Sequence, residues 1–139
     1  MKGLDTLIRM RSWELDECSK ALVAAQQRQD VIRAKQEALE QEIEAEKKRA
    51  SGDVEIGMAF ASYYSAAVVR MEQLQSQWTA ILPEIEAAQE AMAEAFRAVK
   101  QFELVKEELV ERESRALASK EIELMNEVGL NSYRRKMEQ

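Results

Sequence analysis

Side chains that commonly act as acids, bases or nucleophiles are scarce in this sequence or lack partners. It contains no His and a single Cys, Cys18. Without His there is no imidazole to act as a base or to bind a metal. One thiol forms neither an internal disulfide nor a Cys-based zinc site, and no Gly-rich phosphate loop is present. We therefore predict a protein that is not an enzyme and has no catalytic residue, metal site or cofactor.

Aromatic side chains are the first candidates for binding another protein. Trp13, Phe60 and Tyr63 flank the apolar stripe described below, and Tyr64, which lies on that stripe, is a candidate only through the resemblance given at the end of this section. Large aromatics on an exposed helix flank are typical anchors of protein interfaces. In a rod of two helices, the same side chains equally serve to cover the edges of the apolar stripe. Both interpretations stay open.

Basic side chains near the two ends are the second candidates. Residues 1–11 and 129–139 together carry 6 positive and 2 negative charges, and the rest of the chain carries 14 positive and 24 negative charges. Arg134, Arg135 and Lys136 lie in the second of these segments. We expect them to contact an acidic surface, although charges on a helix usually mean only a solvated face. The net charge of −6 argues against nucleic acid as a partner.

The elements that must position these residues are helices. One Pro and four Gly in 139 residues are too few for the turns of a sheet protein, and strong helix formers dominate the rest. The composition predicts one all-α domain and excludes sandwiches, barrels and α/β folds. The sequence has no apolar stretch of about 18 residues and no apolar run of signal-peptide length near its start. A lone thiol fits a reducing compartment, so we expect a cytoplasmic protein.

Few residues break the helical pattern, and they predict its boundaries. Gly52 can end one helix in the left-handed conformation, and Asp53 can cap the next. Pro83 removes a backbone donor and is expected to kink a helix without reversing the chain. Gly129 resembles a second C-terminal cap. Within one elongated unit spanning 1–139, we predict a helix at 4–50, a turn at 51–53, a long helix at 54–128 and a tail at 129–139.

Apolar residues repeat every 3.5 residues in both segments, as in coiled coils. The first stripe has 14 positions from Leu4 to Ala50, of which ten are apolar. The second has 12 positions, ten of them apolar. It comprises Ala61, Tyr64, Val68, Met71, Gln75, Trp78, Leu82, Ile85, Gln89, Met92, Phe96 and Val99. These repeats predict two helices that pair along a stripe.

A turn at Gly52 makes the two helices antiparallel, with facing residues whose numbers sum to about 105. This register places Gln29 opposite Gln75 as a polar layer, and Trp78 beside Ala24 and Ala25. We therefore predict an antiparallel two-helix coiled-coil hairpin.

Because the first helix is shorter, the second overhangs it beyond about residue 103. A thin apolar stripe continues along this part of the chain: Phe102, Leu109, Val110, Leu117, Leu124 and Val128. A lone helix is only marginally stable in water. The overhang is therefore either a fraying tail or a projecting helix that binds a partner.

Several segments resemble flagellar FliJ proteins over nearly the whole chain. They are the opening residues 4–17 (LDTLIRMRSWELDE), the Ser51-Gly52 break, the Tyr63-Tyr64 pair, and the charged stretches at 102–107 and 111–113. The resemblance implies a coiled-coil hairpin of the flagellar type III export apparatus, similar to the terminal helices of a rotary ATPase γ subunit. It implies binding to the export ATPase ring, the export gate and export chaperones, at the inner face of the cell membrane through those partners.

Two alternatives to this function remain open at this point. One is a structural scaffold that self-associates through its apolar stripe. The other is the equivalent stalk of a virulence type III secretion system.

Overall fold

Two long α-helices account for nearly all of the chain. The computed structural model describes residues 2–52 and 54–138. Helix α1 spans Lys2–Ala50 (49 residues), and α2 spans Val54–Glu138 (85 residues). The part of the chain that the structure describes contains no strand. The predicted all-α, two-helix hairpin with an overhanging second helix is thus confirmed, although α1 begins two residues before the predicted Leu4.

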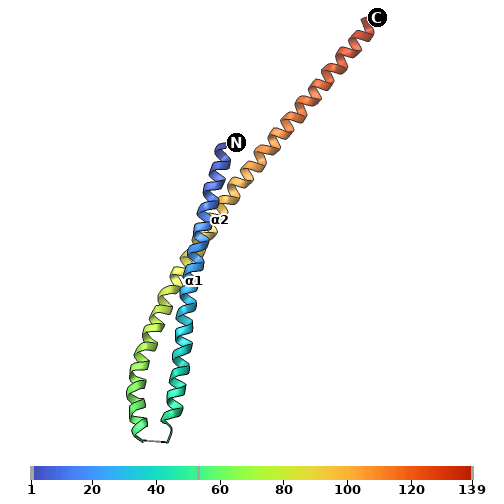
Figure 1. Ribbon diagram of the computed structural model, residues 1–139. Coiled ribbons are helices and arrows are strands. Elements are labelled where there is room, and N and C mark those ends of the chain that lie inside the picture. The colour runs from blue at the N-terminus through green and yellow to red at the C-terminus, as the bar shows by residue number, and fades with distance from the viewer. Residues whose placement is uncertain (1, 53, 139) are drawn as a thin grey trace. The chain divides into compact units, whose positions relative to one another are not determined.

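The chain reverses at Ser51 and Gly52, at the loop that joins the helices in Figure 1. Gly52 has a φ of 110°, which glycine adopts readily because it has no Cβ. The Ser51 hydroxyl donates a hydrogen bond of 3.1 Å to the Lys48 carbonyl, one of the groups left without a helical donor at the end of α1. The break predicted at Gly52 is confirmed. The predicted cap, Asp53, lies outside the described residues.

Helix α2 is longer than its sequence predicts. The predicted end at Val128 and cap at Gly129 are wrong, because the helix continues through both to Glu138. A single Gly costs a helix only about 1 kcal/mol relative to Ala, and the helix formers that follow offset that cost. The helix also passes through Pro83, so the chain does not reverse there. Pro83 still removes the N–H that would bond to the Thr79 carbonyl.

Contacts divide the chain into two units. One unit is Trp13–Phe96, and the other combines Met1–Ser12 with Arg97–Gln139. Each unit joins a stretch of α1 to a stretch of α2, and we describe them separately. One elongated unit spanning residues 1–139 stays a prediction.

The core of the Trp13–Phe96 unit is a line of apolar layers between the two antiparallel helices (Figure 1). Two buried clusters form it: Ala25 with Ile81 and Ile85, and Leu39 and Ile43 with Ala67. Ala67 is 0% exposed and Ala25 is 1% exposed, whereas Ile81 keeps 5%. The smallest side chains are thus the best covered, because only two helices are available to surround each layer.

The apolar stripe predicted on α1 is confirmed, since all 14 of its positions are buried or half-buried. Half of the stripe predicted on α2 is wrong. Six positions are exposed: Ala61, Tyr64, Gln75, Leu82, Gln89 and Phe96. In all six cases the covered position lies one residue earlier, as with Ile81 in place of Leu82. The earlier row is apolar where the predicted row has Gln75 and Gln89, so it buries fewer amide groups.

The register between the helices is also shifted from the prediction. The Arg33 guanidinium lies 5.0 Å from the centre of the Trp78 ring, so Trp78 is not the neighbour of Ala24 and Ala25. Gln75 is exposed, and the polar layer predicted between it and Gln29 does not form. Side chains lean toward the N-terminus of their own helix, which displaces each contact of an antiparallel pair by a few residues. A register counted from the centre of the turn omits this displacement.

In the other unit, the start of α1 packs on α2 near residue 102. The Arg11 guanidinium lies 5.9 Å from the centre of the Phe102 ring, and the Lys106 ammonium lies 2.7 Å from the Asp5 carboxylate. The hydrogen bond from Lys106 lowers the pKa of Asp5 below its usual value of 3.8. Val99 is buried here, at 5% exposure. Beyond Lys106, all of the described residues of α2 are exposed.

Candidate functional site

Exposed apolar residues gather at the start of α2, beside the turn. We define the tip patch as the exposed Val54, Ile56, Met58 and Tyr64, together with the half-buried Phe60 among them. Val54 is 81% exposed and Met58 is 72% exposed. Both residues lie within the first five residues of α2. Phe60 and Tyr64 were predicted as binding residues from the sequence. Val54, Ile56 and Met58 were not, because they lie outside the predicted heptad stripe.

The aromatic residues of this region divide into exposed and covered rings. The Phe60 ring lies 5.8 Å from the Tyr64 ring and 6.2 Å from the Tyr63 ring, between ring centres. Tyr64 is exposed, whereas Tyr63 is half-buried and packs on the cluster that contains Leu39. Of the two tyrosines, Tyr64 is therefore the more accessible to a partner, at 47% exposure.

The Tyr63 hydroxyl is buried next to Glu42. Burial is the main cause that raises the pKa of Tyr63 above its usual value of 10.0, and the negative charge of Glu42 adds to it. The phenol therefore stays neutral in the fold. This side chain helps to join the two helices near the turn.

Trp13 lies on α1 and is the first residue of the Trp13–Phe96 unit, whereas the tip patch follows the turn. Trp13 is 64% exposed. The structure does not bring Trp13 together with the aromatic residues near the turn. It stands as a separate candidate anchor.

The second large surface is the part of α2 beyond Lys106. We call residues 107–138 the overhang, and all of them are exposed. The overhang carries exposed apolar side chains that include Leu117, Leu124 and Val128. Its last turns carry the predicted Arg134, Arg135 and Lys136, which are exposed as well.

The overhang also carries apolar residues that the thin stripe predicted from the sequence does not include. They are Ile122, Met125, Leu130, Tyr133 and Met137, all more than half exposed. Ile122 and Met125 lie off the predicted stripe, and Leu130, Tyr133 and Met137 lie in the segment predicted to be a tail.

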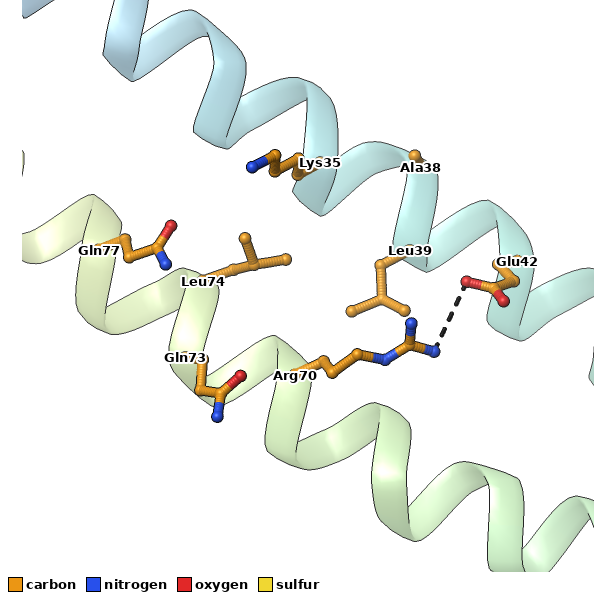
Figure 2. Close-up of a pocket in the computed structure, with 8 residues that line it drawn as sticks. All are labelled: Lys35, Ala38, Leu39, Glu42, Arg70, Gln73, Leu74 and Gln77. Carbon is orange, nitrogen blue, oxygen red and sulfur yellow. Dashed lines mark ion pairs between the residues drawn. The ribbon is translucent and has the colours of Figure 1, made fainter.

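A shallow groove lies between the helices of the Trp13–Phe96 unit, as Figure 2 shows. Its volume is about 330 Å³, and Leu39 and Leu74 point into it from opposite helices. The Arg70 guanidinium lies 3.8 Å from the Glu42 carboxylate at one end. A second groove is flanked by the Arg28–Glu84 ion pair. These pairs cross between helices and help to hold the register.

The side chains of the described residues form neither a metal site nor a membrane span. Within residues 2–52 and 54–138, no group of three or more Asp, Glu or Cys side chains is placed to hold a metal ion. Neither helix, over the same residues, has a stretch long and apolar enough to cross a membrane.

Comparisons with known proteins agree with this geometry. The family described as "Flagellar FliJ protein" matches residues 1–138. No curated protein and no solved structure matches the chain. Because the match covers essentially the whole chain, this protein belongs to the flagellar FliJ family, whose members are coiled-coil components of the flagellar export apparatus.

Proposed function

We propose that this protein is a non-enzymatic stalk and adaptor of the flagellar type III export apparatus, and that its overhang binds the export ATPase ring. The exposure of the overhang is the observation that carries the proposal. A helix with Leu117, Leu124 and Val128 more than half exposed is poorly stable alone and gains apolar burial from a partner. A narrow helix that extends past its neighbour has the shape to enter the opening of a ring.

The charge of the overhang supports the same assignment. Arg134, Arg135 and Lys136 are exposed on its last turns. Three basic side chains at the end of a helix raise the rate and the specificity of association with an acidic surface. The acidic body of the chain does not compete for that surface, because like charges repel.

The tip patch and Trp13 are the proposed contacts for the export gate and for export chaperones. Val54 and Met58 are more than 70% exposed, and the Phe60 and Tyr64 rings lie beside them. Apolar and aromatic anchors of this kind form the centre of many interfaces. With these partners the protein is placed in the cytoplasm, at the inner face of the cell membrane. The family match favours the flagellar over the virulence export system.

Truncation after Lys106 tests the assignment of the overhang. The shortened chain keeps the contacts of Asp5 and Arg11 with α2, so its remaining residues are expected to stay helical by circular dichroism. We expect it to lose binding to the export ATPase. Met58→Ala/Tyr64→Ala is the matched control, and it should bind the ATPase as the full chain does. ATPase binding that survives the truncation contradicts the proposal.

A further inference from the structure

Two successive turns of α2 carry defects in their main-chain hydrogen bonding. Pro83 has no N–H, so the carbonyl of Thr79 lacks its helical donor, and the proline ring crowds that carbonyl. The Thr79 hydroxyl donates a hydrogen bond of 3.0 Å to the carbonyl of Gln75, one turn earlier. Bonds of this kind from Ser or Thr often bend a helix. The segment 75–83 therefore resists bending less than an unbroken helix does.

Both defects lie on the side of α2 that faces water. Thr79 and Pro83 are exposed. Two residues on the opposite side of the helix, Ile81 and Ile85, belong to the buried cluster with Ala25 of α1. A proline bends its helix away from its own ring, because the ring pushes against the carbonyl one turn back. The bend is therefore directed toward α1, with its outer side in water.

The contacts between the helices at this level allow the bend to change. Ala25 is small and almost fully buried, so it is a compact point on which α2 can turn. The Arg28–Glu84 ion pair joins the helices next to Pro83, but both side chains are about half exposed, and such pairs contribute little to stability. The groove that this pair flanks has a volume of about 390 Å³. Neighbouring side chains can therefore shift without a clash.

We propose that the segment 75–83 is a hinge of α2. The part of the helix on the side of the turn, 54–74, moves relative to 84–96 about the layer of Ala25, Ile81 and Ile85. The motion changes the curvature of α2 around α1 and the width of the groove beside the Arg28–Glu84 pair. The hinge lies within the Trp13–Phe96 unit, so it is independent of what the overhang binds.

Distances between spin labels, measured by double electron–electron resonance, test the hinge. Glu72→Cys/Glu90→Cys in a Cys18→Ala background places two labels on its outer side, 18 residues and about 27 Å apart. The matched control, Gln26→Cys/Glu44→Cys, has the same separation on α1, which contains no Pro. All four labelled positions are exposed. We expect the distance distribution across the hinge to be at least twice as wide as that of the control.

Replacing the proline separates a hinge from a merely uneven helix. Pro83→Ala restores the missing N–H with the best helix former, so helix content by circular dichroism should be unchanged or higher. The labels lie on the outer side of the bend, so their mean distance should shorten, and the width should fall to that of the control. Thr79→Val removes only the hydroxyl bond and should narrow the distribution in part. A distribution as narrow as the control, or one that Pro83→Ala leaves unchanged, overturns the proposal.

Discussion

Two neighbouring residues of α2 test which row of side chains faces α1. Ile81 is 5% exposed and belongs to the cluster with Ala25, whereas Leu82 is 45% exposed. Ile81→Ala and Leu82→Ala each delete three carbon atoms, so the deletion is the same in size. The two variants differ only in where those atoms lie.

We expect Ile81→Ala to cost far more stability than Leu82→Ala. Deleting a buried Ile or Leu side chain to Ala costs about 2–5 kcal/mol in a globular core. Only two helices surround Ile81, so neighbouring side chains and water can partly fill the space, and we expect about 2–3 kcal/mol. Leu82 loses less burial, and its loss should stay below about 1 kcal/mol.

Urea unfolding followed by far-ultraviolet circular dichroism measures the difference. At a slope of about 2 kcal/mol per molar urea, Ile81→Ala should lower the midpoint by about 1 M. The midpoint of Leu82→Ala should fall by less than half as much. An equal or larger fall for Leu82→Ala would refute the assigned row and restore the one expected from the sequence.

Three further predictions follow from the structure. The Lys106 hydrogen bond lowers the pKa of Asp5. The ionised Asp5 carboxylate therefore stabilises the fold above pH 3.8, and this stabilisation is lost as pH falls through the lowered pKa. Asp5→Asn should remove this pH dependence from acid unfolding curves. The pKa of Tyr63 is raised above 10.0, so the stability that the neutral phenol contributes is lost as pH rises beyond that value. An absorbance titration should show one tyrosine that ionises at higher pH than the others, and Tyr63→Phe should remove that step. Gly129→Ala should raise helix content and stabilise the overhang by about 0.5–1 kcal/mol, because the added Cβ meets open space. Gly52→Ala should instead destabilise the turn, because the φ of Gly52 is 110°.

The hairpin could be predicted from the sequence because so few residues break the helices. Gly52 lies between two long periodic segments, and no comparable break exists elsewhere before the overhang. The α1 stripe could be predicted for a related reason. Leu15, Leu39 and Ile43 have no large apolar residue beside them in the sequence, so they favour one row.

The details on α2 could not be predicted in the same way. Ile81 and Leu82 are adjacent and similarly apolar, so counting apolar residues does not decide which of them faces α1. The contact register depends on the lean of side chains, which the spacing of residues does not contain. Gly129 resembles a cap only if other stop signals accompany it, and none follows in the next residues.

The candidate surfaces were predictable in kind but not in extent. Trp13, Tyr64 and the basic residues near 135 are exposed, as binding residues must be. Tyr63 is half-buried, since its neighbours come from α1 and are far away in the sequence. Val54 and Met58 could not be predicted as binding candidates, because they lie outside the heptad stripe.

The narrow cross-section of the hairpin has a consequence for how it opens. Within the Trp13–Phe96 unit, the two buried clusters share no residue, so we expect each layer to depend mainly on its nearest layers, as in proteins built from stacked repeats. Stability is then a sum of local steps, and separation can begin at either end without loosening the far end. The cluster near Leu39 and the cluster near Ile81 should exchange their amide hydrogens at different rates. A partner that binds one end of this unit can therefore separate a few layers and leave the layers at its other end packed.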